Sequence, residues 1–277
     1  MSALRRLRAR ASRTQLRAPI VWLRHLGLDN SDVFLASYPR SGNTLLRFVL
    51  AEVMSGVPSS FDSIQRMIPE IGVHVHAHPL VPGGGCLIKT HEPYRRKYQR
   101  AIYVVRDVRD VMLSSFARET ALDVVHIRTL DEYVRPFMRG HMTRFGSWQD
   151  HVEGWTNSPL AKRGDLLLLR FEEVRSDLEK AVSRCLDFLG KKVDPAIIRN
   201  AVRSNSLEQM RVKEDEAKTL PKSPGEFGRW VGKGSVQGWR NALTEPQLKI
   251  VEEFAHDTLQ RFDYPVGVVA SHRERAS

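Results

Sequence analysis

A polar loop between a predicted strand and a predicted helix, at residues 38–44, constrains this chain more than any other stretch. Residues 33–36 are apolar and suit a buried strand. Apolar residues then recur at helical spacing between positions 45 and 53, and Gly56 can end that helix. The loop itself holds a glycine, hydroxyl groups and an arginine. Because N–H groups at the start of a helix attract anions, this stretch predicts a phosphate-type ligand.

The loop lacks the ordinary P-loop pattern, Gly-x-x-x-x-Gly-Lys-Ser/Thr. No glycine stands five residues before Gly42, and Asn43 occupies the position of the lysine. A P-loop nucleoside or sugar kinase stays open as an alternative, but it should show that lysine and a magnesium-binding acid. A second alternative is an ordinary strand-to-helix turn, since serine, glycine and asparagine are common turn residues.

Three further apolar stretches predict strands, and helical patterns separate them along the chain. The stretches are residues 86–91, 101–105 and 166–169. An amphipathic pattern ended by Gly190 predicts a helix over 178–189, and another predicts the last helix over 248–262. Strands that alternate with helices predict an α/β fold of three layers, with a central, mostly parallel sheet and helices on both faces. Such a fold can carry a P-loop-like nucleotide site at residues 38–44.

Two of these predicted strands end in polar residues suited to chemistry. Lys89 and His91 lie at the end of the second strand, and Arg106 directly follows the third. Ser114 comes eight residues after Arg106, on the helix expected there. Active groups in parallel sheets gather at the carboxyl ends of the strands, so we expect these side chains to approach residues 38–44. Taken alone, a single histidine is more often structural, and Arg106 could serve only in surface ion pairs.

The loop sequence Tyr-Pro-Arg-Ser-Gly-Asn-Thr at 38–44 resembles the 5′-phosphosulfate loop of sulfotransferases that use 3′-phosphoadenosine 5′-phosphosulfate (PAPS). Lys-Thr-His at 89–91 resembles the family run that supplies the catalytic histidine. Arg106 and Ser114 keep the spacing of the family's 3′-phosphate pair. The order of these motifs along the chain is more specific than any one of them.

Two later stretches extend the resemblance, which covers roughly residues 31–265. Ser206 falls in a stretch similar to the family segment near the adenine and 3′-phosphate. Lys233 and Gly234 match the last two residues of the family's late Arg-Lys-Gly loop.

The resemblance implies a PAPS-dependent sulfotransferase, which moves a sulfuryl group to a hydroxyl or amine of a small-molecule, lipid or saccharide acceptor. It implies that His91 takes the acceptor proton, while Lys89 and Arg40 stabilise charge on the leaving phosphate. It implies donor binding by Arg40, Ser41, Gly42, Asn43, Thr44, Arg106, Ser114, Ser206, Lys233 and Gly234. Since cationic side chains can neutralise the leaving group, we expect that no metal is required.

The chain departs from the family pattern at several donor-site positions. Arg40 stands where the family usually has lysine, and Asn43 replaces the first of two threonines. Leu45, Phe171 and Gly232 replace a tryptophan, a tyrosine and an arginine. Arginine keeps the charge of lysine but differs from it in shape and in hydrogen bonding. A sulfotransferase-like protein with impaired donor binding is therefore a further alternative.

The N-terminal segment carries much of the positive charge of the chain. Seven arginines and one acid in residues 1–30 give +6 of the formal net charge of +11. The segment could contact an anionic membrane surface or nucleic acid, so a non-catalytic, basic protein that binds such surfaces is a further alternative. For the sulfotransferase itself we expect no nucleic-acid partner. A frayed, solvated end is the simpler expectation, although apolar residues within 16–23 could also form a short helix packed on the body.

The predicted organisation is a basic extension over residues 1–30, a sulfotransferase domain over 31–267 and a C-terminal tail over 268–277. Cys86 and Cys185 lie far apart, without metal-ligand or redox spacing, which favours a reducing compartment. With no apolar run of about 18 residues, we expect a cytoplasmic protein. The sequence leaves the oligomeric state open.

Two polar stretches give weaker expectations. His74, His76 and His78 alternate and would share one face of a strand, but no nearby acid or cysteine completes a metal site. We therefore expect a polar loop edge there. Residues 212–227 combine polar residues with proline and glycine, which predicts a mobile loop.

Overall fold

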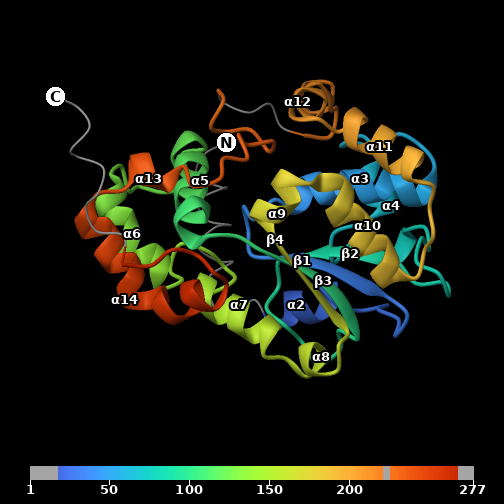
Figure 1. Cartoon of the computed structure of the whole chain (residues 1–277), viewed down its shortest axis with the longest axis horizontal. Helices are drawn as coiled ribbons and strands as arrows, with labels where there is room; N and C mark the ends of the chain where they lie inside the picture. The colour runs from blue at the N-terminus through green and yellow to red at the C-terminus, as the bar shows by residue number, and fades with distance from the viewer. Residues whose placement is uncertain (1–17, 221–224, 268–277) are drawn as a thin grey trace.

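The computed structural model describes residues 18–220 and 225–267, and its centre is a sheet of four parallel strands (Figure 1). The strands, in the spatial order β2-β1-β3-β4, are β1 (Val33–Ser37), β2 (Leu87–Thr90), β3 (Arg100–Val105) and β4 (Leu166–Arg170). Every predicted strand is present, with ends shifted by no more than one residue. Ala36 of β1 pairs with Thr90 of β2 and with Tyr103 of β3, so these strands end at the same edge of the sheet.

Helices cover both faces of the sheet and confirm the three-layer prediction (Figure 1). One face packs against α3 (Asn43–Ser55), α4 (Ile64–Met67), α9 (Phe171–Ser176), α10 (Leu178–Leu189), α11 (Pro195–Ser204) and α12 (Leu207–Asp215). The other packs against α5 (Val108–Ala121), α6 (Leu130–Met138), α7 (Trp148–Thr156), α8 (Pro159–Lys162), α13 (Trp239–Ala242) and α14 (Glu245–Arg261). Two smaller elements, α2 (Ala18–Arg24) and η2 (His74–His76), complete the described helices.

The central strands are buried on both faces because their side chains alternate between two hydrophobic clusters. Phe34 and Ala36 of β1 belong to the cluster on the α5 side, whereas Val33 and Leu35 belong to the cluster on the α3 side. Strands buried in this way read as continuous apolar runs, which is why β1 was visible in the sequence.

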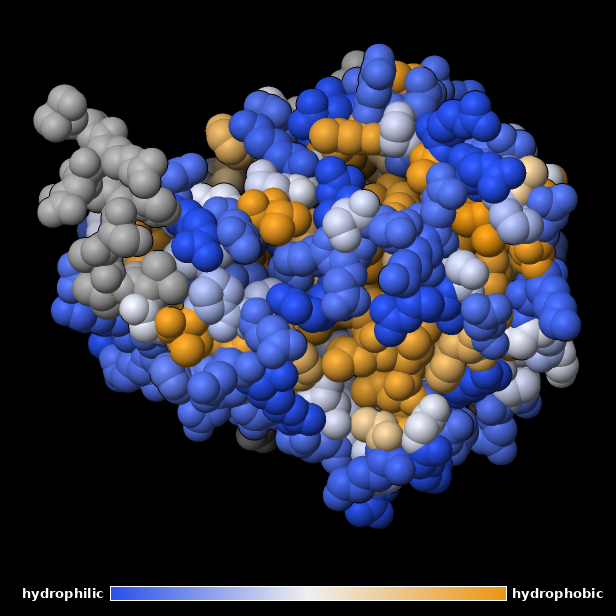
Figure 2. Space-filling view, in the orientation of Figure 1, coloured by the Kyte–Doolittle hydropathy of each residue, from blue (hydrophilic) through white to orange (hydrophobic). Residues whose placement is uncertain are grey.

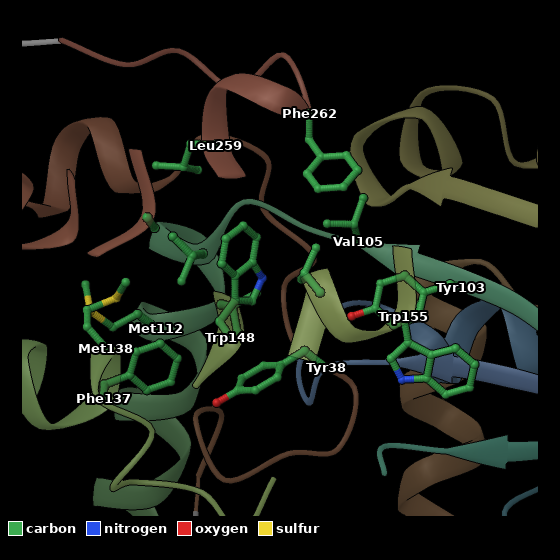
Figure 3. Close-up of a cluster of buried hydrophobic side chains, with 14 of the residues drawn as sticks. Tyr38, Tyr103, Val105, Met112, Phe137, Met138, Trp148, Trp155, Leu259 and Phe262 are labelled. Atoms are coloured by element: carbon green, nitrogen blue, oxygen red, sulfur yellow. The ribbon is translucent and has the colours of Figure 1, made fainter. Parts of the chain in front are cut away.

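Aromatic side chains on the α5 side connect the core to the ends of the strands (Figure 3). Trp148 and Trp155 are both fully buried in this cluster. The indole Nε1 of Trp148 donates to the carbonyl of Arg106 at 3.1 Å, and that of Trp155 donates to the carbonyl of Glu92 at 3.1 Å. The core therefore fixes the segments that follow β2 and β3.

The surface shown in Figure 2 is mostly hydrophilic, with hydrophobic residues exposed through the middle of that face. The formal net charge of +11 belongs to the whole chain, including segments outside the described residues. Of the helices that the structure describes, none combines the length and apolar character needed to cross a membrane.

The alternating histidines lie in and just after a short helix within a loop, and not on a strand. His74 to His76 form the short 3-10 helix η2, so the three histidines do not share the face of a strand. His74 is buried, and burial lowers the pKa of its imidazole. Within residues 18–220 and 225–267, no group of three or more histidine, cysteine or acidic side chains is arranged to hold a metal ion.

Two segments predicted to be irregular are helical at one end. Residues 212–215 belong to α12, where Glu214 is buried against the loop that follows; the predicted mobile loop is wrong there. Residues 18–24 form α2, whose Val21 is buried, and the adjoining His25 accepts a hydrogen bond from Tyr98. The expected frayed end is therefore wrong for residues 18–24, where the alternative of a short helix packed on the body is confirmed. Residues 1–17 and 268–277 lie outside the described residues.

Candidate functional site

The loop at residues 38–44, here called the early loop, joins β1 to α3 through two residues with left-handed backbone. Arg40 and Gly42 have φ values of 68° and 84°. Among the described residues, no side chain caps α3, which leaves the first N–H groups of the helix available to a ligand. Ser41 is buried, and its hydroxyl has no hydrogen-bond partner among the described residues. A buried hydroxyl beside free N–H groups is what an anion-binding loop requires.

Two residues of the early loop hold its shape. A Cβ atom on Gly42 would lie 2.3 Å from ring carbons of Phe171, so no other residue fits there without a shift. The side-chain amide of Asn43 donates to the carbonyl of Leu35 at 3.1 Å and to the hydroxyl of Ser37 at 3.2 Å. The Asn43 side chain therefore ties the loop to β1, and its contribution to a ligand would come from the backbone.

Arg106, directly after β3, connects the early loop to residues 226–238, here called the late loop. Its Nη1 donates to the carbonyl of Arg40 at 2.7 Å, and its Nη2 donates to the carbonyl of Ser235 at 2.8 Å. The guanidinium carbon lies 4.4 Å from the ring centroid of Phe171. The Nε atom is buried and has no partner in the part of the chain that the structure describes. Arg106 thus keeps one donor for a ligand between the two loops.

The side chain of Arg40 extends from the early loop to α5. Its Nε donates to the hydroxyl of Ser114 at 2.9 Å. Burial, and after it the neighbouring guanidinium groups of Arg118 and Arg106, lower the pKa of Arg40 to about 10. Within the described ranges, Arg40 forms no ion pair with a carboxylate. Arg40, Arg106 and Arg118 thus form a cluster of positive charge suited to a polyanion, although the carboxylate of Glu214 also lies near Arg40.

The position of Arg40 depends on a glycine in the late loop. A Cβ atom on Gly232 would lie 3.0 Å from Nη2 of Arg40. A side chain at position 232 would therefore crowd the end of the Arg40 side chain, which would have to shift by a few tenths of an ångström. Two of the departures from the family pattern, at positions 40 and 232, meet in space.

Carboxylates from two helices hold the late loop. Asp110 of α5 accepts from the N–H groups of Gln237 and Trp239 at 2.8 and 3.0 Å. Glu214 of α12 accepts from the N–H groups of residues 230–231 at 2.7 and 3.0 Å. Both carboxylates are buried, so each N–H bond to them is charge-assisted. The sequence pattern did not single out either acid.

The two late-loop residues predicted to bind the donor, Lys233 and Gly234, have no described contact that holds them against the arginine cluster. The side chain of Lys233 is 58% exposed, and its Nζ lies 3.8 Å from a carboxylate oxygen of Glu226. Gly234 has φ 63°, and a Cβ atom there would lie 3.4 Å from Nε of Arg175. None of the contacts described for Lys233 reaches Arg106 or Ser114.

His91 lies beside the start of the early loop. Its Nδ1 is 2.8 Å from the carbonyl of Ser37. Because a carbonyl only accepts, Nδ1 carries the proton and Nε2 keeps its lone pair. Burial, and then the ammonium group of Lys89, lower the pKa of His91 to about 3. The ring is therefore neutral near pH 7 and can accept a proton at Nε2.

Lys89 is paired with an acid that the sequence analysis missed. Its Nζ lies 2.6 Å from Oε1 of Glu70. Pro69 and Ile71 pair with the backbone of Lys89, at 2.7 and 2.9 Å, and this places Glu70 alongside β2. Burial lowers the pKa of Lys89, and the ammonium group lowers that of Glu70 to about 2. No spacing rule connects these two residues, because an extra bridge beside the sheet brings them together.

A second histidine supports the first. His151 of α7 is buried, and its Nε2 donates to the carbonyl of His91 at 3.0 Å. Its Nδ1 accepts from the hydroxyl of Tyr103 at 2.8 Å. Burial lowers the pKa of His151 to about 4, so this ring is also neutral near pH 7. His151 had no signal in the sequence beyond its place on an amphipathic helix.

The structure brings most, but not all, of the predicted site residues together. Contacts link Arg40, Arg106 and Ser114 around the early loop. Thr44 is half-buried in the first turn of α3. Ser206 is exposed and caps α12 by accepting from the N–H of Gln209, with no described contact to the arginine cluster. The site can hold a polyanion between the two loops and accept a proton beside it.

The chain is also similar to known proteins over most of its length. The family model described as a sulfotransferase domain matches residues 30–263. Sulfotransferase 1C2 of Rattus norvegicus is 25% identical over 243 residues, which cover 78% of this chain and 79% of the relative.

Two solved structures show the same fold. Retinol dehydratase in complex with androsterone and the inactive cofactor PAP superimposes with a TM-score of 0.68 and 20% identity, covering 89% of this chain and 86% of that chain. A mouse sulfotransferase in complex with PAP superimposes with a TM-score of 0.64 and 23% identity, covering 90% and 92%.

Proposed function

The chain belongs to the sulfotransferase family, and on this premise we propose that it transfers a sulfuryl group from PAPS to a hydroxyl of a small-molecule acceptor. The observation that carries the proposal is an anion-binding early loop beside the neutral imidazole of His91. PAP in the structurally similar proteins supports the donor, and androsterone in one of them supports a lipophilic acceptor. Amines, lipids and saccharides are further acceptor classes that could react by the same chemistry.

The proposed donor contacts fall at the two anionic ends of PAPS. The free N–H groups of α3 and the unpartnered hydroxyl of Ser41 suit the 5′-phosphosulfate. The free Nε of Arg106 and the hydroxyl of Ser114 suit the 3′-phosphate. Arg40 extends from the first group to the second, so its guanidinium group can serve both ends. Direct roles for Thr44, Ser206, Lys233 and Gly234 stay predictions from the resemblance.

In the proposed reaction, the acceptor oxygen attacks sulfur while the bond from sulfur to the 5′-phosphate oxygen breaks. His91 Nε2 takes the acceptor proton, and adenosine 3′,5′-bisphosphate leaves with the bonding electron pair. Lys89 and Arg40 would stabilise the charge that develops on the leaving phosphate, and fixed donors of this kind commonly contribute several kcal/mol. Lys89 is held ready by Glu70, whose carboxylate keeps the buried ammonium charged.

A kinase is less well supported by the same geometry. The position of the P-loop lysine is taken by Asn43, whose amide is occupied by Leu35 and Ser37. Two buried acids beside the late loop, Asp110 and Glu214, already accept backbone N–H groups, which leaves each of them little capacity for magnesium.

The test separates donor binding from chemistry. Adenosine 3′,5′-bisphosphate should raise the melting temperature of the protein more than ATP does, because a ligand that binds only the native state stabilises it. His91→Ala should leave that shift in place and lower turnover by roughly 10² to 10⁴ with an acceptor found by screening, the usual size of general-base catalysis. His256→Ala, on the exposed surface of α14, is the matched control.

The pH profile provides an independent check on His91. A base fails only when it is protonated, so a pKa of about 3 predicts that the acid-side loss of kcat/KM attributable to His91 lies well below the ordinary histidine range near 6.5. A folded His91→Ala variant with near-normal turnover would make His91 a structural residue. Equal thermal shifts with ATP and the bisphosphate would count against the sulfotransferase proposal itself.

A further inference from the structure

The helix α2 presents its apolar side chains to solvent. Ile20, Trp22, Leu23 and Leu26 project outward from this segment, whereas Val21 is buried. A surface helix normally shows the opposite arrangement, with polar residues outside and apolar residues inside. Single exposed apolar residues need no explanation, but a whole helix face of them does.

Two further apolar residues extend this face. Val73 and Val75 belong to the loop around η2, and a Cβ atom on Gly27 would lie 3.5 Å from Cγ2 of Val75. The patch formed by Ile20, Trp22, Leu23, Leu26, Val73 and Val75, here called the α2 patch, has side chains between 43% and 65% exposed. Exposed apolar groups that adjoin in this way indicate an interaction surface.

The α2 patch is anchored firmly to the body of the protein. His25 accepts from the hydroxyl of Tyr98 at 2.6 Å, and its Nδ1 donates to the carbonyl of Val21 at 2.6 Å. Arg24 donates to the carbonyl of Ile71 at 2.6 Å. The buried side of α2 is thus fixed by specific bonds, so the outward position of Trp22 follows from the packing.

Positive charge surrounds the patch on the side of Tyr98. Arg95, Arg96 and Lys97 are exposed in the turn before that tyrosine, and the charge of Arg95 contributes to the lowered pKa of His25. Residues 1–17, which precede α2 in the sequence, contain six arginines and no acid. Basic residues therefore precede the α2 patch in sequence, and others lie near it in space.

We propose that the α2 patch docks on the surface of an anionic lipid bilayer. Tryptophan and aliphatic side chains enter the boundary between headgroups and acyl chains, while arginine and lysine meet the acidic headgroups. A protein partner would explain the apolar residues of the patch. It would not explain why residues 1–17 contain six arginines and no acid. Nucleic acid would explain the charge but not six exposed aliphatic and aromatic side chains. The bilayer surface accounts for both observations.

The test is sedimentation of the full chain with lipid vesicles. The protein should bind vesicles made of phosphatidylcholine and phosphatidylglycerol in equal amounts, and bind vesicles of phosphatidylcholine alone at least about tenfold more weakly. The variant Ile20→Ser/Trp22→Ser/Leu23→Ser should lose at least about tenfold in partitioning to the mixed vesicles, because it removes most of the apolar anchor. The matched control is Val57→Ser/Ile197→Ser/Val212→Ser, whose residues have similar exposure elsewhere; it should bind as the wild type does.

Tryptophan emission gives a second measurement that does not depend on the triple variant folding. Trp22 emission should shift to shorter wavelength when mixed vesicles are added, and Trp22→Phe should abolish the shift. Trp230→Phe, at the other exposed tryptophan, should keep it. Equal binding of the folded α2-patch variant, or loss of binding only on removal of residues 1–17, would overturn the proposal. So would self-association through the patch without any vesicle binding.

Discussion

The early and late loops face the same arginine cluster, but they are held in different ways. The early loop is shaped by its own residues: Gly42 fits against Phe171, and Asn43 is bonded to the strand that it follows. The late loop is held by carboxylates from other helices, Asp110 and Glu214, which accept its N–H groups. The first arrangement depends on the size and bonding of the loop's own side chains, whereas the second depends on bonds to the loop's backbone.

This difference predicts which positions of the donor site tolerate substitution. A loop defined by a glycine and a strand-to-helix turn tolerates few substitutions, because backbone and side chain are constrained together. A loop held from outside through its backbone can change its own side chains while keeping its place. The replacement of the family's arginine by Gly232 occurs in the second kind of loop.

The largest predicted effect compares glycines of the two loops. Gly42→Ala should lower the free energy of unfolding by about 2–4 kcal/mol, from left-handed strain plus overlap with Phe171. Gly234→Ala should cost only about 1–2 kcal/mol, because its φ of 63° is equally strained but its Cβ has room. Urea denaturation would measure both, with Gly154→Ala in α7 as a control, because alanine at that position adds neither φ strain nor a close contact. Similar losses for Gly42 and Gly234 would refute the contrast.

The next prediction concerns the arginine that joins the two loops. Arg106→Ala removes donors to the early-loop carbonyl of Arg40 and to the late-loop carbonyl of Ser235. The affinity for adenosine 3′,5′-bisphosphate should fall about ten- to hundredfold, as for a lost charge-assisted contact of about 1.5–3 kcal/mol. Arg118→Ala is the comparison, because Arg118 donates to the late-loop carbonyls of residues 228–229 and is described with no bond to the early loop.

Calorimetric titration of both arginine variants would give the two dissociation constants, with melting curves to exclude misfolding. Arg118→Ala should weaken the bisphosphate less than Arg106→Ala does. A larger rise of the dissociation constant in Arg118→Ala than in Arg106→Ala would contradict this prediction. It would mean that the late loop contributes more to donor binding than the contact between the two loops does.

The third prediction couples positions 40 and 232. Arg40→Lys alone should weaken donor binding, because lysine cannot keep the bond from Nε to Ser114. Gly232→Arg alone should also weaken it, because a side chain at position 232 crowds the Arg40 guanidinium group. The double variant, which restores the family pattern, should bind better than either single one, with a coupling energy of about 0.5–3 kcal/mol. Additive losses in this cycle would mean that the two positions act independently.

The sequence predicted what local patterns determine and missed what long-range contacts determine. The four strands and the early loop were readable because a buried strand, a glycine and a helix pattern follow one another directly. Glu70 was not readable, because it reaches Lys89 only through an added bridge beside β2. His151 was likewise hidden, since a histidine on an amphipathic helix gives no sign of the carbonyl that it will meet.

The smallest predicted effect concerns Lys233, the late-loop residue that the resemblance assigned to donor binding. Its side chain is 58% exposed and lies near Glu226, so solvent screens its charge and no bond orients it toward Arg106. Lys233→Ala should therefore change the binding free energy of adenosine 3′,5′-bisphosphate by less than about 1 kcal/mol, which is the range of an exposed ion pair. Raising the salt concentration should shrink that change further, whereas the loss in Arg106→Ala should persist because Arg106 is buried. A loss in Lys233→Ala as large as that in Arg106→Ala would show that the late loop closes on the bound nucleotide and carries Lys233 into the site.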